Sequence, residues 1–387
     1  MVKFPGDADK SATGKNEVAF RDMKDLAAVN RETGDTPIEK GVSFRDLEAR
    51  SFFGTGEDGP ANENKDLVFT GLDAGAAQDA LKEARRIYNG AKNELFKIFR
   101  SIQRNEDFSI DVMLPFASDF VSHILKETDC WLQIVYTEEN EDDLAMQIVI
   151  HSLNTAVIAV KIGAGLDHAN EKIEALALRA FFHDVGMLRV PTEVVQKTGS
   201  LTPGEIGMIK EHPKYGYEIL SKAKSRYTNL AKVTYQEHER HDGSGYPQGL
   251  KNGDISDYSL IIGVADIYSA LIHPRPYRPR YLPFDAVKQI IITSKGKFPN
   301  NVMKALVNEF STFPKGIFVR LNSKEVGRVV SSYKIAPLRP VVEIIYDANG
   351  KKLAKPKTVD MFKDHILQIE ESFFTEEDID GNDKSAN

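Results

Sequence analysis

The residues in this sequence best suited to chemistry are His183 and Asp184, which stand side by side at the end of an apolar stretch. Ahead of them, apolar residues recur at spacings of three and four from Ile173 to Phe181, as in a buried helix. A neutral imidazole and a carboxylate can each ligate a divalent metal, and the two carboxylate oxygens can bridge a pair of metals. A single pair of this kind is more often hydrogen-bonded in a core, so the metal interpretation depends on further ligands.

Two more histidines fall where the chain could aim an imidazole. His151 lies on the apolar face of a helix expected over 144–162, where by itself it would be an ordinary core histidine. His212 precedes Pro213, and because proline disfavours helical geometry in the residue before it, we expect His212 at a helix break. The helix before that break has a clear start in Thr202-Pro203-Gly204-Glu205, with a Thr cap, Pro at the first helical position and Glu three residues after the cap.

Acidic and histidine side chains recur further along the chain. The segment 236–247 reads Gln-Glu-His-Glu-Arg-His-Asp-Gly-Ser-Gly-Tyr-Pro, which places several ligand-type side chains at a helix end before a glycine-rich turn. Asp266 is the one acid in a very apolar helix expected over 260–272. Because burying an unpaired carboxylate costs several kcal/mol, Asp266 needs a partner, which is either a metal or an arginine such as Arg179.

Composition limits what these residues can do. A chain of 387 residues with 41% hydrophobic content can bury a full core and form more than one domain. The single cysteine, Cys130, excludes an intramolecular disulfide and a cysteine-based zinc cluster, so any metal must be held by histidine and carboxylate. The net charge of -7 argues against a nucleic-acid polymer or an anionic membrane as partner, but leaves room for a small anionic ligand in a local basic pocket.

The same survey bears on location. The N-terminus has no apolar run like that of a secretory signal, and no stretch approaches the roughly 18 to 20 uncharged apolar residues that span a bilayer. We therefore expect a cytoplasmic protein with no membrane span.

Changes in periodicity divide the chain into five parts. Residues 1–72 are polar, and we expect a poorly ordered or irregular extension. Residues 73–142 are predicted to be helical, and their long amphipathic helix over 74–104 suits dimerisation, although packing on its own domain is the plainer interpretation. The candidate ligands all fall within the helical part, 143–311. Residues 312–373 read as strands with a hairpin turn at Asp347-Ala348-Asn349-Gly350, and 374–387 form an acidic tail.

The chain resembles the HD-GYP family, the helical branch of the HD phosphohydrolases that hydrolyses cyclic di-GMP. The matching blocks keep the family's order and spacing over about 143–310, and they are His151-Ser152-Leu153-Asn154, Phe182-His183-Asp184-Val185-Gly186, Leu201-Thr202-Pro203 with His212-Pro213, Glu239-Arg240 with Asp242-Gly243-Ser244-Gly245-Tyr246-Pro247, Val264-Ala265-Asp266, and Arg275-Pro276-Tyr277-Arg278. The resemblance implies a mainly α fold, a helical HD-type bundle with an N-terminal helical region and a small C-terminal β module.

The resemblance also implies two divalent metals, iron or manganese, bridged by a carboxylate. Carried over position by position, one metal is held by His151, His183, Asp184 and Asp266, and the other by Asp184, His212, Glu237 and His238. A metal-bridging hydroxide is the implied nucleophile, with His183 and Asp184 as catalytic residues. Arg275 and Arg278 would contact ligand phosphates, with Tyr246 near the guanine-bearing ligand. The alternatives are a solvated turn for the arginines and a structural or partner-docking loop for Tyr246.

Three positions depart from the family pattern. Glu237 stands where the family has a histidine, and its added negative charge weakens the Lewis acidity of the metals. Met187 replaces a lysine, and a thioether cannot donate to a phosphate oxygen or a leaving group. Gln147 stands where a subset of the family has a glutamate for a third metal, which favours two metals.

We therefore predict a metal-dependent phosphodiesterase that hydrolyses cyclic di-GMP to pGpG or GMP, with low activity. The alternative is a catalytically weak or inactive relative that binds metal or cyclic di-GMP and signals to a partner protein. A hydrolase of another nucleotide fits less well, because the Gly-Tyr-Pro block and both arginines are present. The expected partners are cyclic di-GMP, a diguanylate cyclase or other signalling protein, and a second copy of the chain through the N-terminal helices.

Overall fold

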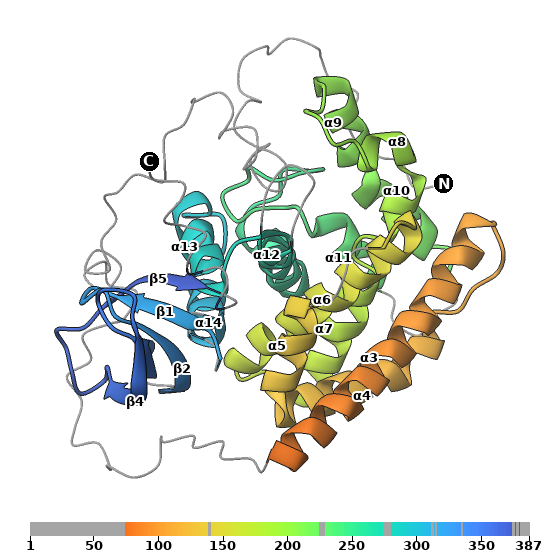
Figure 1. Cartoon of the computed structure of the whole chain (residues 1–387). Coiled ribbons are helices and arrows are strands. Elements are labelled where there is room, and N and C mark those ends of the chain that lie inside the picture. The colour runs from red at the N-terminus through yellow and green to blue at the C-terminus, as the bar shows by residue number, and fades with distance from the viewer. Residues whose placement is uncertain are drawn as a thin grey trace.

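The computed structural model describes residues 74–137, 141–223, 229–273, 280–310, 313, 316–333, 336–373, 376 and 379. Within these residues a large helical body is followed along the chain by a small antiparallel sheet (Figure 1). The mainly α class predicted from the sequence is confirmed. The predicted extension 1–72, most of the acidic tail, and both Arg275 and Arg278 lie outside the described residues.

Three helices form the centre of the body: α6 (Leu144–Gly165), α7 (Asn170–Phe181) and α12 (Asp257–Ile272). Both α6 and α12 are apolar on nearly every face and are buried along most of their length, as expected of helices enclosed by others. The side chain of Asp143 caps α6 by accepting a hydrogen bond from the backbone N–H of Met146 at 3.1 Å. These enclosed helices carry His151 and Asp266.

The apolar character of α6 is greater than the sequence analysis expects. Among the described helices, α6 alone has the length and hydropathy that could cross a membrane, and 83% of that stretch is buried inside the protein. This burial is typical of the core helix of a globular domain.

The N-terminal helices α3 (Ala74–Gln103), α4 (Leu114–Lys126) and α5 (Thr128–Thr137) lie against this centre, with the short 3-10 helix η1 (Asp111–Met113) between α3 and α4 (Figure 1). Their contact is aromatic: the Phe120 ring centroid lies 4.5 Å from that of Trp131 and 5.2 Å from that of Phe181. The apolar face of α3, including Ala84, Tyr88 and Leu95, is buried in the same core. The plainer interpretation of this helix is therefore confirmed, and dimerisation stays a prediction.

Shorter elements connect α7 to α12 and form the rim of the site. They are the 3-10 helices η2 (Val185–Arg189) and η3 (Asn252–Asp254) and the helices α8 (Thr192–Val195), α9 (Pro203–Lys210), α10 (His212–Leu220) and α11 (Leu230–Gln236). The predicted start of α9 is confirmed, since Thr202 and Glu205 form a reciprocal capping box with Pro203 at the first helical position. Two further helices, α13 (Pro283–Thr293) and α14 (Asn300–Phe310), lead to the sheet.

The sheet is antiparallel, with strand order β4-β3-β2-β1-β5. Its strands are β1 (Phe318–Leu321), β2 (Val326–Tyr333), β3 (Ala336–Tyr346), β4 (Lys352–Asp360) and β5 (Ile369–Phe373). The predicted hairpin turn joins β3 to β4: Asp347 Oδ1 accepts from the backbone N–H groups of Asn349 and Lys351, both at 2.9 Å. Val319, Val342 and Ile344 belong to a second hydrophobic cluster, distinct from that of the helical body.

Candidate metal centre

His183 and Asp184 occupy the turn between α7 and η2. Phe181 and Phe182 are fully buried just before it, which anchors the turn to the core. His183 is 1% exposed, and its Nδ1 donates to the carbonyl oxygen of Ala180 at 2.8 Å. The lone pair of Nε2 is then left for the site, as in histidines that ligate metals.

His212 is held in the same way. It is the first residue of α10, directly after the end of α9, which confirms the helix break predicted before Pro213. Its Nδ1 donates to the carbonyl oxygen of Ile209 at 2.7 Å. The Nε2 lone pair of His212 is therefore also directed away from the backbone and toward the acidic residues.

A first group of ligand atoms is formed by His151, His183 and Asp266, and these atoms lie within 4.8 Å of one another. His151 Nε2 is 2.8 Å from Asp266 Oδ1, and His183 Nε2 is 3.9 Å from the same oxygen. Asp266 thus finds its partners in this group. Arg179, the alternative partner, donates to the carbonyl oxygen of Ala175 and lies over the Tyr258 ring.

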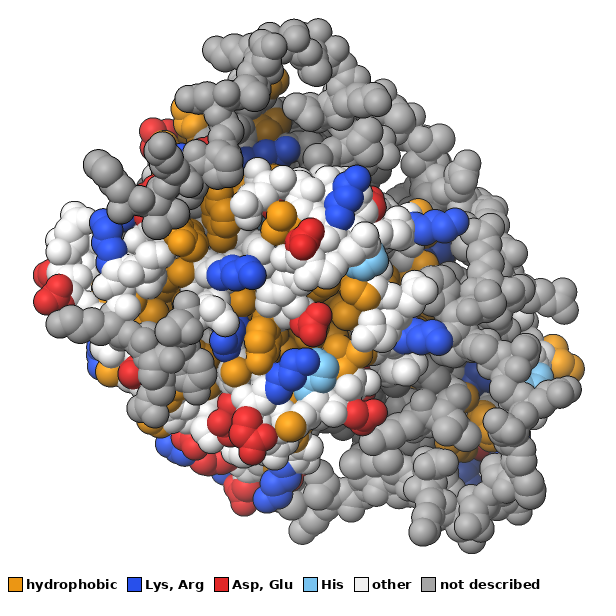
Figure 2. Space-filling view, turned by 180° about the vertical axis from the view of Figure 1, so that it is seen from behind, with side chains coloured by type: hydrophobic (Ala, Val, Ile, Leu, Met, Phe, Trp, Pro, Cys, Tyr) orange, Lys and Arg blue, Asp and Glu red, His pale blue; other side chains and the backbone are white. Residues whose placement is uncertain are grey.

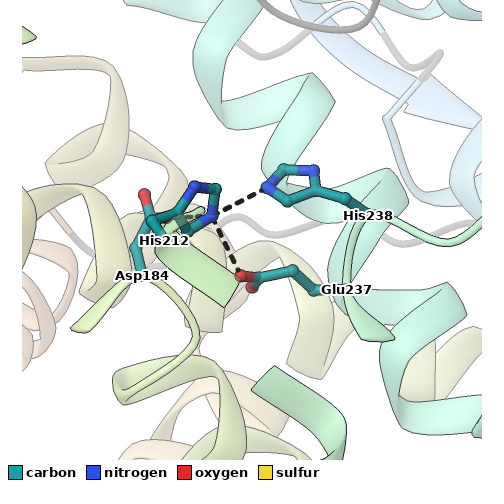
Figure 3. Close-up of side chains that lie close together, drawn as sticks. All are labelled: Asp184, His212, Glu237 and His238. Atoms are coloured by element: carbon teal, nitrogen blue, oxygen red, sulfur yellow. Dashed lines mark hydrogen bonds and ion pairs between the residues drawn. The ribbon is translucent and has the colours of Figure 1, made fainter. Parts of the chain in front are cut away.

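A second group contains Asp184, His212, Glu237 and His238, again with ligand atoms within 4.8 Å of one another (Figure 3). His212 Nε2 is 3.3 Å from Glu237 Oε1 and 3.0 Å from His238 Nε2. Figure 3 shows the three side chains pointing toward one another. Glu237, the residue that departs from the family pattern, therefore lies inside the cluster with its carboxylate facing the other members.

Asp184 stands between the two groups. Its Oδ1 is 3.3 Å from His212 Nε2 in the second group. Its Oδ2 faces the first group, at 3.7 Å from His151 Nε2 and 3.9 Å from His183 Nε2. One carboxylate thus presents one oxygen to each group, which is the arrangement a bridging ligand needs.

The cluster has the unsatisfied groups expected of a metal site. His183 Nε2 and both carboxylate oxygens of Glu237 are buried and lack a hydrogen-bond partner among the described residues. Buried polar groups are normally paired, because an unpaired one forfeits the hydrogen bonds that it made with water. Divalent cations bound to imidazole and carboxylate would satisfy these atoms, so the residues present fit divalent metals.

Burial also sets the protonation of the cluster. It lowers the pKa of His183 and holds the pKa of His238 well below its usual range, with His212 adding to the effect at His238. Burial raises the pKa of the Glu237 carboxyl well above its ordinary value, and the nearby Asp184 and Asp266 carboxylates raise it further. For Asp266, burial acts to raise the pKa, but the hydrogen bond and charge of His151 outweigh it and the pKa is lowered. The lowered pKa values of His183 and His238 favour their neutral forms, which keep the lone pairs that a metal requires.

The loop after His238 is fastened by residues whose role the sequence analysis missed. Arg240 is fully buried and donates to the carbonyl oxygens of Glu237 and Glu239, at 3.0 and 2.9 Å. The Glu239 carboxylate accepts from the backbone N–H groups of Gln248 and Leu250, at 2.7 and 2.9 Å. No local sequence pattern signals this burial, because both side chains are satisfied by backbone groups of the loop and not by each other.

Tyr246 is brought to the site by this loop. Its ring stacks on the His238 imidazole, with the centroids 4.7 Å apart and the planes at 14°. Ser269 lies on the other side of the cluster, with its Oγ 3.4 Å from His151 Nδ1. Met187 in η2 is half-buried and packs against the main hydrophobic core. Apart from Arg275 and Arg278, which lie outside the described residues, the predicted site residues are thus gathered in one place.

Two family models match parts of this chain. Residues 133–301 match the family model described as HD domain, and residues 318–381 match the one described as KOW domain associated with HD domain. The first match contains both candidate ligand groups, and the second covers the antiparallel sheet.

Two curated relatives share this region. A cyclic di-GMP phosphodiesterase of Pseudomonas aeruginosa is 24% identical over 286 residues, which are 74% of this chain and 68% of the relative. The cyclic di-GMP phosphodiesterase PdeB of Borreliella burgdorferi is 33% identical over 208 residues, which are 54% of each chain. The matched regions therefore span 68% of the length of the first relative and 54% of the length of the second.

A solved structure shares the fold. It is described as an HDG"Y"P protein from Bdellovibrio bacteriovorus, and it superposes with a TM-score of 0.50 at 20% sequence identity. The likeness covers 62% of this chain and 73% of the other.

Proposed function

We propose that residues 133–301 form an HD domain of the HD-GYP family and that the protein is a metal-dependent phosphodiesterase that hydrolyses cyclic di-GMP, which the HD domain match and the curated relatives support. The observation that carries the proposal is the pair of ligand groups that share Asp184, one carboxylate oxygen facing each. Hydrolysis adds water across one phosphodiester bond, leaving a 5′-phosphate and a 3′-hydroxyl, so the first product is linear pGpG and a second cleavage gives GMP.

In the proposed function, each of the two ligand groups binds one metal. One divalent cation would be held by His151, His183 and Asp266, and the other by His212, Glu237 and His238. Asp184 would bind both. When bound, such a pair would supply Lewis acidity to the phosphate and would lower the pKa of water so that a metal-bridging hydroxide could act as the nucleophile. The protein orients the imidazoles through the carbonyl oxygens of Ala180 and Ile209, and Arg275 and Arg278 are proposed to bind the phosphates.

Iron and manganese are the proposed metals, because the donor set is imidazole and carboxylate without thiolate. The same proposal includes a cytoplasmic location, a diguanylate cyclase or other signalling protein as partner, and a homodimer through the N-terminal helices. They are supported by the substrate, which is a signalling nucleotide, and by the length of α3.

A second candidate is a relative that binds the nucleotide with little or no turnover. Met187 favours it, because its thioether packs against the hydrophobic core and cannot donate a proton or a hydrogen bond to a leaving oxygen. If this side chain limits the rate, Met187→Lys raises kcat without raising the metal content.

The test is to incubate the full chain, loaded with Mn²⁺ or Fe²⁺, with cyclic di-GMP and to separate the products by chromatography. The proposal expects metal-dependent formation of pGpG that EDTA abolishes. Tight binding without product would support the second candidate. Metal-loaded protein that neither binds nor cleaves cyclic di-GMP, but cleaves another phosphodiester, would contradict both.

A further inference from the structure

Glu237 gives the two ligand groups the same set of donor atoms. The first group offers two imidazoles and two carboxylates, from His151, His183, Asp266 and the shared Asp184. The second group offers the same numbers, from His212, His238, Glu237 and Asp184. A histidine at position 237 would leave the second group with three imidazoles and one carboxylate. The side chain at this position therefore decides how many oxygen donors the second group presents.

The backbone around Glu237 fixes its carboxylate inside the cluster. Glu237 directly follows the last residue of α11 and is 1% exposed. Its carbonyl oxygen accepts from the Arg240 guanidinium at 3.0 Å, and a Cβ at Gly263 of α12 would lie 2.5 Å from the same oxygen. Because the backbone is held between Arg240 and α12, the side chain stays buried, and Figure 3 shows it pointing toward His212.

Hydrogen bonding does not account for this carboxylate. Among the described residues, neither of its oxygens has a hydrogen-bond partner, although Oε1 lies 3.3 Å from His212 Nε2. A role in holding neighbouring elements together would need such hydrogen bonds, and a buried carboxylate without donors is strongly destabilising. A cation bound with the other members of the group would remove this penalty, so the geometry supports metal binding as the role of Glu237.

Oxygen and nitrogen donors differ in the metals that they favour. Carboxylate oxygen suits manganese, whereas imidazole nitrogen suits iron and the later divalent metals. In the general order of affinities, iron is bound more tightly than manganese. Exchanging one imidazole for a carboxylate works against this order, because manganese loses less than iron when a nitrogen donor gives way to oxygen.

We propose that Glu237 selects manganese over iron at the second ligand group, by supplying an oxygen donor where an imidazole would supply nitrogen. This inference rests on the proposed function only for the presence of metals in the two groups. It does not depend on which nucleotide the protein cleaves.

The experiment compares the wild type with Glu237→His, Glu237→Gln and Asp257→His, each as the full chain stripped of metal. Each protein is dialysed without oxygen against equal free concentrations of Mn²⁺ and Fe²⁺, and the bound metals are counted by mass spectrometry. Crystals grown from the same mixture, with diffraction data collected at the manganese and iron absorption edges, assign each metal to its group. Asp257→His controls for an added histidine, because Asp257 is exposed at the start of α12.

In the wild type we expect the second group to hold manganese at least as often as iron. Glu237→His should raise the iron-to-manganese ratio in the second group by about tenfold and leave the ratio in the first group nearly unchanged. Glu237→Gln keeps an oxygen donor and loses the negative charge, so both metals should bind more weakly at nearly the wild-type ratio. Asp257→His should resemble the wild type in both groups.

An unchanged ratio in Glu237→His would overturn the inference, and so would a second group filled by iron alone in the wild type. An equal shift in Glu237→Gln would overturn it as well, because charge and not the donor atom would then select the metal. If Glu237→His does not fold, the wild type and Glu237→Gln still decide the matter.

The two proposals can fail separately, because the cleavage of cyclic di-GMP by the wild type is assayed apart from metal selection. Manganese selected as expected without cleavage would contradict the proposed function alone. Cleavage with an unchanged ratio in Glu237→His would contradict this inference alone, and a wild type that takes up no metal would contradict both.

Discussion

Asp184 is the residue on which the two ligand groups depend, since each of its carboxylate oxygens faces a different group. In Asp184→Ala both groups lose a ligand at once. We expect the metal content, measured by mass spectrometry of the purified protein, to fall from two ions per chain to fewer than one, with hydrolysis abolished. Asp257→Ala, which removes an exposed carboxylate from the helix that carries Asp266, is the control and should keep both metals. Full metal content in Asp184→Ala would exclude the bridging role.

Replacing Glu237 should have opposite effects on metal binding and on the stability of the metal-free protein. Its buried carboxylate accepts no hydrogen bond from the described residues, which destabilises the metal-free protein, whereas in the metal-loaded protein it would be a ligand. We expect Glu237→Gln to weaken metal binding and to stabilise the metal-free protein by about 1–3 kcal/mol at neutral pH, because the amide carries no charge to bury. Metal titration and thermal unfolding in EDTA measure the two effects.

The stabilisation of the metal-free protein by Glu237→Gln should also depend on pH. Burial raises the folded-state pKa of the Glu237 carboxyl well above 4.5, so the folded protein holds this proton more tightly than the unfolded chain does. Below pH 4.5 the carboxyl is protonated in both states and the variant should gain little. As the pH rises above 4.5, the wild type loses stability relative to Glu237→Gln. A gain that is the same at pH 4 and pH 7 would contradict this explanation.

At the scale of elements, the packing of η2 against α10 brings Asp184 and His212 together. Gly186 makes this possible, because a Cβ at this position would lie 1.9 Å from the carbonyl oxygen of His212 and 2.5 Å from the backbone nitrogen of Gly216. We expect Gly186→Ala to separate the two elements and to cost more than about 3 kcal/mol of stability, together with the loss of metal.

A glycine in α9 offers the matched control. A Cβ at Gly207 would meet nothing within 4 Å, and the residue lies in an exposed helix. Gly207→Ala should therefore stabilise the protein by up to about 1 kcal/mol and leave the metal content unchanged. Denaturant unfolding of the two variants checks the contrast, and equal effects at the two positions would show that η2 and α10 can move apart freely.

The elements that could be predicted are those specified locally. The capping box at Thr202 and Glu205 and the turn at Asp347 each lie within a few residues of sequence, and both form as expected. The burial of Arg240 could not be predicted in this way, because it depends on the Phe298 ring, which lies 4.9 Å from the guanidinium and comes from a distant part of the chain.

Prediction of the metal ligands from the sequence has the same limit. The residue types and the resemblance named its members, but the sharing of Asp184 between the groups depends on how α6, α7 and α12 pack.

At the scale of the molecule, the metal cluster ties together elements that are far apart in the chain. Its ligands come from α6, the turn after α7, the start of α10, the end of α11, and α12. Metal binding should therefore stabilise the whole helical body. At a hundredfold excess of free metal over its Kd, we expect the Tm to rise by roughly 5–10 °C. Differential scanning calorimetry with Mn²⁺ and with EDTA measures the shift, which should vanish in Asp184→Ala.

The surface adds a constraint on partners. On the face seen in Figure 2, Lys and Arg side chains are interspersed with Asp and Glu side chains. A mixed surface of this kind suits the proposed function, in which an anionic ligand is held at a local site, the candidate metal centre. The antiparallel sheet, with its own hydrophobic cluster, lies outside that site and contributes none of the ligands.

Anomalous scattering from crystals of the manganese-loaded protein, collected at the manganese edge, addresses the metal centre directly. We predict two peaks per chain on either side of the Asp184 carboxylate, one among His151, His183 and Asp266 and the other among His212, Glu237 and His238. One peak, no peak, or peaks away from Asp184 would contradict the two-metal site from which the phosphodiesterase function is inferred.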